Sequence, residues 1–151
     1  FRSHTNKLRN FKDWRRGEVM IPKYRVWDKE LQTMLDVSLI DFKKRVLVGE
    51  HWEFGETNLM NFDEIVLMQS TGLKDDFDKE IFEGDVILWT YWDEFEDSGR
   101  AKVIFDKGMF KLLDIRTEKE VWDNLFDCIE NCNVYLQGNI YEITESLEVK
   151  E

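Results

Sequence analysis

The sequence feature that most constrains the fold is a run of large side chains at residues 86–92, VILWTYW, preceded by turn residues at 84–85. Such a run predicts a strand that is covered on both faces or packs one face against a partner. An acidic stretch at residues 93–99 is expected to be a loop, and two short apolar segments then flank a turn at residues 106–108. The glycine of that turn can supply the positive φ that a tight hairpin needs. Together these segments predict a partly open, SH3-like barrel, an analogy of shape that carries no function.

The first part of the chain predicts a separate, smaller β-unit. Residues 23–34 alternate and are rich in strand formers around a polar turn, which is typical of a hairpin. Further strands are expected at residues 45–48, 52–54 and 65–68. We therefore predict a β-rich α+β fold of two small packed β-units, residues 20–66 and residues 67–151.

One amphipathic helix is expected in the second unit, over residues 118–131. Thr117 and Glu120 have the spacing of a capping box, in which each side chain bonds the backbone of the other residue. Apolar residues then recur at intervals of three and four and form one stripe: Val121, Trp122, Leu125, Phe126, Ile129 and Cys132. Residues 134–136 and 139–141 are expected to be short extended segments.

The distribution of charge excludes one class of function. The chain has 151 residues and a formal net charge of −11. Residues 1–19 carry six Lys or Arg and two Asp or Glu, whereas the remainder carries 15 and 30, a net charge of −15. Because nucleic-acid binding depends on clustered cations, we expect no direct nucleic-acid binding by this acidic body.

The hydropathy and the cysteines indicate a cytoplasmic protein. The sequence has no apolar run of the roughly 18–20 residues that a membrane span needs, and no apolar signal core near residue 1. We therefore expect no membrane association. Cys128 and Cys132 are the only cysteines, and two thiols four residues apart do not form a disulfide framework.

Four acidic residues are close enough in sequence to be considered as a calcium site: Asp75, Asp76, Asp78 and Glu80. With Asp76 as the first ligand of an EF-hand loop, Ile81 replaces the required glycine and Ile87 replaces the bidentate glutamate. A solvated turn is therefore the better interpretation of these acids.

The sequence also offers no convincing zinc or nucleophilic site. Cys128 and Cys132 can share a helix face, but zinc requires four ligands and only His4 and His51 could complete the set. His51 has neighbouring carboxylates in sequence, and no serine or cysteine has a recognisable helper. We predict no catalytic, cofactor-binding or metal-binding residues, and no enzymatic activity.

Three segments resemble the YopX family of bacteriophage and prophage proteins: MIPKYRVWD at residues 20–28, MQSTGLKDDFDKEIFEGDVILW at residues 68–89, and GNIYE at residues 138–142. The resemblance covers nearly all of residues 20–151, and the family has no established biochemical activity. Similar members usually have an Asp-Asn-Gly type of turn where this chain has residues 75–78. That departure leaves the turn type open, because Phe77 tolerates positive φ poorly.

The resemblance begins at Met20, which bears on residues 1–19. Residues 15–19, RRGEV, can be encoded by a purine-rich stretch of the kind that precedes a bacterial start codon. We expect residues 1–19 to be a translated leader or cloning-derived sequence. The alternative is a basic arm that docks on the acidic body or on a polyanion.

The aromatic content points toward protein contacts. Six Trp, eleven Phe and four Tyr make up 14% of the chain, and one modest sheet cannot bury Trp89, Tyr91 and Trp92 together. Trp and Tyr are enriched at the centres of protein interfaces. For any one of these residues, however, a core position with its polar tip at the surface is an equally good interpretation.

The leading hypothesis is a phage accessory protein that acts by protein–protein contacts, as a homo-oligomer or with a host or phage protein. The first alternative is an acidic DNA-mimic decoy, which would need carboxylates in rows at phosphate spacing on one face. The second alternative is an enzyme with an unrecognised site, which would require a deep pocket with polar groups around His51 or the acidic loops.

Overall fold

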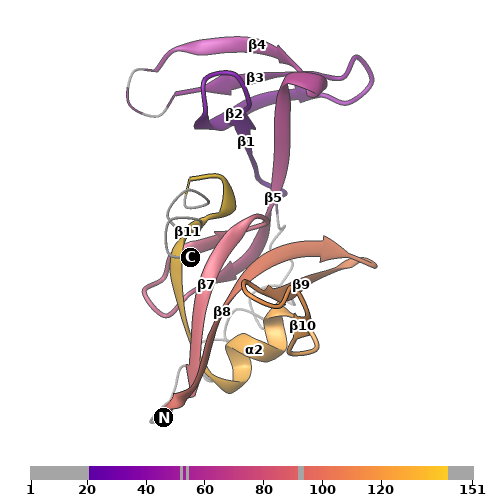
Figure 1. Cartoon of the computed structure of the whole chain (residues 1–151). Helices are drawn as coiled ribbons and strands as arrows, with labels where there is room; N and C mark the ends of the chain where they lie inside the picture. Colours follow the sequence, from indigo (N-terminus) through magenta and orange to yellow (C-terminus); the bar gives the residue numbers. More distant parts are fainter. Residues whose placement is uncertain (1–20, 52, 54, 92–93, 143–151) are drawn as a thin grey trace.

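The structure is a computed structural model that describes residues 21–51, 53, 55–91 and 94–142. Within these residues the chain forms two antiparallel sheets and one α-helix of seven residues, and the sheets do not close into a barrel. The predicted β-rich α+β class is therefore confirmed. Figure 1 shows residues 24–61 of the first sheet above the second sheet, and the strand at residues 65–74 runs down from them toward it.

The first sheet has six strands in the order β4-β3-β2-β1-β5-β6. All of its paired strands are antiparallel, and a short 3-10 helix, η1, separates β4 from β5. The bounds are β1 (Tyr24–Asp28), β2 (Thr33–Asp41), β3 (Val46–Glu50), β4 (Thr57–Asn61), η1 (Phe62–Glu64), β5 (Ile65–Lys74) and β6 (Glu80–Phe82).

The core of this sheet follows from its register. Ile40 lies opposite Leu47, and Leu47 lies opposite Met60, so these three side chains share one face. That face belongs to a cluster with a buried centre of five residues: Val26, Leu35, Leu47, Met60 and Ile65. The predicted hairpin at residues 23–34 is confirmed, with the turn formed where Asp28 Oδ1 accepts hydrogen bonds from the backbone N–H groups of Glu30 and Leu31.

The second sheet has five strands in the order β10-β9-β8-β7-β11, and it packs against helix α2. A buried cluster joins the sheet to the helix through Ile87, Val103 and Leu112 on the strands and Leu125 and Cys128 on α2. The bounds are β7 (Asp85–Tyr91), β8 (Glu94–Asp106), β9 (Met109–Asp114), β10 (Glu120–Val121), α2 (Leu125–Asn131) and β11 (Asn133–Asn139).

The hairpin of β8 and β9 has the predicted tight turn. Asp106 lies opposite Met109, and the two residues between them both adopt positive φ, 52° at Lys107 and 78° at Gly108. Two successive residues with positive φ are the requirement of a type I′ turn, whose twist matches that of the flanking strands.

The predicted helix start at residue 118 is wrong. Thr117 lies in the turn between β9 and β10, and Glu120 pairs with Leu113 of β9. The helix begins at Leu125, because the side chain of Asn124 accepts a hydrogen bond from the backbone N–H of Asp127 at 2.9 Å. Asparagine is as good an N-cap as threonine, and strand pairing decides between the two positions.

Three further expectations need correction. The acidic stretch at residues 93–99 is not simply a loop, because β8 already begins at Glu94 and continues through it. Residues 139–141 are not extended throughout, since residues 140–142 are helical. Of the predicted strand at residues 52–54, residues 52 and 54 lie outside the described residues, and Glu53 lies in a turn. Strand β4 was not predicted from the sequence.

The two units meet at a buried ion pair and along one shared strand. Arg25 of β1 donates to Asp85 of β7 at 2.7 Å, and the guanidinium also lies 4.7 Å from the centre of the Phe82 ring. Burial raises the pKa of Asp85, although Arg25 opposes that shift. Strand β5 pairs with β1 through residues 65–69 and with β6 through its second half, so the predicted boundary at residue 66 falls inside one strand.

Candidate functional site

The acids considered as a calcium site are occupied by contacts within the chain. Asp75 is buried, and its carboxylate accepts hydrogen bonds from the backbone N–H groups of Phe77, Lys79 and Leu136, each at 2.9 Å. The positive φ of this turn lies at Asp78, so Phe77 does not have to adopt that conformation. Asp75 therefore organises the β5–β6 turn and holds it against β11.

Glu80, the last of these acids, belongs to the sheet. It accepts hydrogen bonds from Ser70 and Lys23, in strand β5 and beside strand β1. Burial pushes the pKa of Glu80 up, but these two hydrogen bonds and the charge of Lys23 outweigh burial and lower the pKa. Within the described residues, no group of three or more His, Cys, Asp or Glu side chains is arranged to hold a metal ion.

The structure does not bring His51 to the cysteines. His51 follows β3 in the first sheet, where its Nδ1 accepts a hydrogen bond from the backbone N–H of Glu53 at 3.2 Å. Cys128 and Cys132 lie at α2 in the second unit, both fully buried, with their Sγ atoms 3.4 Å apart. His4, the other ligand considered for zinc, lies outside the described residues.

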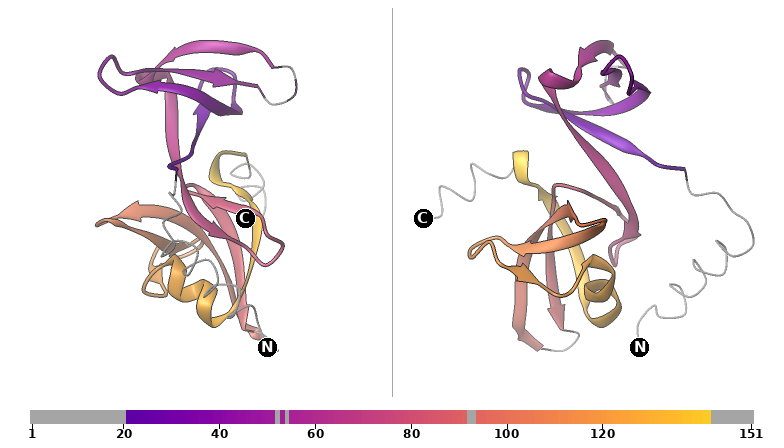
Figure 2. Two further views of the ribbon diagram at one scale, coloured as in Figure 1. Left: turned by 180° about the vertical axis from the view of Figure 1, so that it is seen from behind. Right: turned by 90° about the vertical axis from the view of Figure 1, so that its right-hand side faces the viewer.

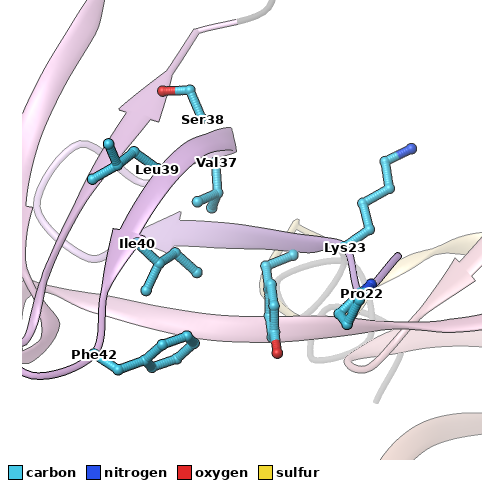
Figure 3. A pocket seen from close by; sticks show the side chains of 8 residues that line it. Pro22, Lys23, Val37, Ser38, Leu39, Ile40 and Phe42 are labelled. Atoms are coloured by element: carbon cyan, nitrogen blue, oxygen red, sulfur yellow. The ribbon is translucent and has the colours of Figure 1, made fainter. Parts of the chain in front are cut away.

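The first sheet carries an apolar groove of about 280 Å³ where β1 and β2 diverge (Figure 3). Residues 37–41 of β2 pair with β3 alone, because the pairing of β1 with β2 ends at Arg25 and Asp36. The groove is lined by Pro22, Lys23, Tyr24, Val37, Ser38, Leu39, Ile40 and Phe42. This lining offers apolar contact, the amine of Lys23 and the hydroxyl groups of Tyr24 and Ser38, but no carboxylate, imidazole or thiol.

Two of the three aromatic residues expected at a contact surface, Trp89 and Tyr91, lie against Trp122. The Trp89 ring meets the Trp122 ring edge-to-face with centroids 5.5 Å apart, and Tyr91 lies 6.2 Å from Trp89 and 5.7 Å from Trp122. Both tryptophans are half-buried and pack against the core of the second unit, whereas Tyr91 is 39% exposed. Trp92 lies outside the described residues. These rings therefore serve the core more than the sequence suggested.

A more exposed apolar surface lies on the other face of the first sheet. Leu39 lies opposite Val48, and Val48 lies opposite Leu59, so the three side chains cross β2, β3 and β4 as one row, which we call the leucine row. Leu39 is 56% exposed and Leu59 is 73% exposed. Sequence reasoning missed this row, although the alternation Leu47-Val48 gives a signal for an apolar residue on each face.

The charged side chains are interspersed where the structure describes ion pairs. Lys111 lies 3.7 Å from Asp106 and 3.1 Å from Glu120, and Lys102 lies 3.6 Å from Glu118. Mixed signs of this kind are typical of a solvated surface. They give no support to the rows of carboxylates that a DNA mimic needs, and the decoy hypothesis stays a prediction.

The described residues include no helix with the length and apolar character that a bilayer crossing needs.

A search of curated proteins gives no match. Several solved structures are similar to this chain. The crystal structure of protein EF1440 from Enterococcus faecalis has a TM-score of 0.58 at 24% identity, covering 85% of this chain and 99% of that one.

The crystal structure of protein yopX from Bacillus subtilis has a TM-score of 0.56 at 21% identity, covering 82% of this chain and 95% of that one. At such identities the likeness shows the fold alone, and neither name states an activity. The model of the family described as YopX protein matches residues 23–148, which is most of the chain. The chain therefore belongs to the YopX family.

Proposed function

We propose that this chain is a phage or prophage accessory protein that acts by protein–protein contacts and associates with copies of itself. The leucine row is the observation that carries the proposal. Leu39 and Leu59 hold large apolar side chains in water on the open face of a sheet whose other face is already packed. Full burial of such a side chain is worth about 1.5–3 kcal/mol, and apolar groups gathered on a surface are typical of interfaces.

The proposed setting is the bacterial cytoplasm. Cys128 and Cys132 are thiols rather than a disulfide and serve the core around α2, which suits a reducing compartment. The groove beside Pro22 has no carboxylate, imidazole or thiol in its lining, and the ion pairs around Lys111 mix charges of both signs. Neither observation favours an enzyme or a decoy over a binding protein.

Sedimentation velocity of the full chain tests the self-association. We expect the weight-average sedimentation coefficient to rise with concentration and to reach that of a dimer or larger oligomer on the order of tens of micromolar. A constant monomer value across that range would contradict the self-association part of the proposal.

A further inference from the structure

We infer that two copies of this chain pair through strand β4, antiparallel and with Leu59 opposite its symmetry mate. This inference rests on the proposed function, because it names the partner and the surface of the self-association. It concerns the free edge of the first sheet, which is the uppermost strand in Figure 1. Both views in Figure 2 show β4 on the outside of the molecule, away from the second unit.

Strand β4 is an unprotected edge. It pairs with β3 on one side, and no described strand pairs with its other side. Natural proteins usually protect such edges with charged residues, proline or bulges, because the free N–H and C=O groups can pair with another chain. The strand Thr57–Asn61 has the sequence TNLMN, with no charge and no proline, and its register with β3 is regular over all five residues.

The two faces of the sheet restrict the register. Thr57, Leu59 and Asn61 face outward with the leucine row, whereas Met60 faces the core and is 6% exposed. A shift by one residue would place outward side chains opposite inward ones. The registers that keep outward side chains opposite one another differ in which residue lies on the two-fold axis. With Leu59 on the axis, all five residues of the strand are paired, whereas with Asn58 or Met60 on the axis only three of them are paired.

This register also joins the two leucine rows. Leu59 then lies beside Leu59 of the other copy, and the rows of Leu39, Val48 and Leu59 become one continuous apolar band across the joined sheets. Thr57 lies opposite Asn61, so the remaining outward pairs are polar and uncharged. Cross-strand pairs of these kinds each contribute roughly 0.2–1 kcal/mol to pairing, whereas like charges placed opposite oppose it.

One exposed charge near each end of β4 can pair across this symmetry. Glu56 precedes the strand, is exposed and has no ion-pair partner among the described residues of its own chain. Continued pairing places Glu56 opposite Phe62 of the other copy. Arg45, which is 66% exposed, lies over the Phe62 ring at 5.3 Å and pairs with Asp63 of its own chain at 3.9 Å. In the inferred dimer each Glu56 lies near the Arg45 of its partner, which it shares with Asp63, and the two-fold symmetry makes this contact twice.

Substitution of Leu59 tests the interface. Leu59→Lys places two like charges side by side at the symmetry axis and is expected to weaken the dimer at least about tenfold in sedimentation velocity. Leu31→Lys is the matched control, since Leu31 is 64% exposed but lies in the turn between β1 and β2, outside the leucine row and away from the edge. The control is expected to keep the dimerisation constant within about threefold of wild type.

Cross-linking tests the register. In Leu59→Cys the two Cα atoms would be about 4.5–5.5 Å apart, within the range of a disulfide. In Thr57→Cys the two copies of the substituted residue would lie four strand positions apart, roughly 13 Å, which is too far. Mild oxidation is therefore expected to give a covalent dimer with the first variant and not with the second. The unsubstituted chain, whose cysteines are buried, is the control.

A pair of charge reversals tests the contact at the strand ends. Glu56→Arg and Arg45→Glu each place like charges together and are expected to weaken the homodimer, whereas mixing the two variants is expected to restore association as a heterodimer.

Failure of the inference is distinct from failure of the proposed function. If the wild type associates but Leu59→Lys associates equally well, or Leu59→Cys gives no covalent dimer, the inference is overturned and the self-association stands. A wild type that remains monomeric overturns both.

Discussion

Breaking the buried ion pair between Arg25 and Asp85 is expected to destabilise the fold strongly. Arg25 Nη2 donates to Asp85 Oδ1 at 2.7 Å, and the two side chains are 14% and 2% exposed. Loss of one partner from such a pair leaves an uncompensated charge out of water, which typically costs about 3–5 kcal/mol. Asp85→Asn nearly preserves the volume and retains an oxygen for the backbone N–H of Phe82, so it isolates the loss of charge.

The reverse substitution, Arg25→Met, is expected to depend on pH. Burial already raises the pKa of Asp85 above its ordinary value of 3.8, and removal of Arg25 removes an effect that lowers it. The folded-state pKa in the variant therefore exceeds the unfolded value by more. A carboxyl group with a raised folded-state pKa contributes stability at low pH, and this contribution is lost as the pH rises from the unfolded to the folded pKa. Relative to wild type, Arg25→Met should be less destabilised at about pH 5 than at about pH 8.

Urea unfolding followed by tryptophan fluorescence measures these effects for both single variants and for Arg25→Met/Asp85→Asn. The double variant contains no buried charge at this position, so it is expected to be more stable than the sum of the single costs predicts, by about 2–3 kcal/mol. Additive single effects, or single costs below about 1 kcal/mol at neutral pH, would refute the argument that each charge compensates the other.

Three further predictions concern stability and use the same unfolding assay. Asp75→Ala leaves three backbone N–H groups without their acceptor and is expected to cost about 3 kcal/mol or more; a cost below about 1 kcal/mol would contradict its role in the turn. Gly99→Ala brings a Cβ within 3.1 Å of the Trp89 ring and should cost about 1–3 kcal/mol, with a changed near-ultraviolet circular dichroism spectrum. Asn124→Ala removes the N-cap of α2 and should lower the free energy of unfolding by about 1 kcal/mol. An equal loss for Thr117→Ala would instead support a helix that begins at residue 118, as the sequence predicted.

The sequence predicts most strands of this fold because their chemistry is local. Residues 86–92 have no alternative to a strand, and the turn at residues 106–108 contains the glycine that its geometry needs. The helix start could not be predicted in the same way. Thr117 and Asn124 are both good N-caps, and only the pairing of Glu120 with β9, a tertiary contact, removes residues 120–121 from the helix.

Strand β4 shows a second limit of sequence reasoning. Its five residues include two asparagines, which are depleted in strands, and its pairing with β3 supplies the structure that its own composition does not favour. The acidic residues at 93–99 are a similar case. Repulsion between carboxylates predicts a loop, but Ser98 and Gly99 pair with Thr90 and Trp89 of β7.

Sequence reasoning could not predict the leucine row or the free edge of β4, for the same reason that it could not predict β4 or the start of α2. All of these features depend on which strands become neighbours in the fold. A body with a net charge of −15 repels its own copies, and the repulsion is weakest where the approaching surfaces carry no charge. Strand β4 is such a surface, since none of its five residues is charged. In the proposed antiparallel pairing each Glu56 lies away from its own copy, whereas a parallel arrangement would place each of these carboxylates beside its own copy.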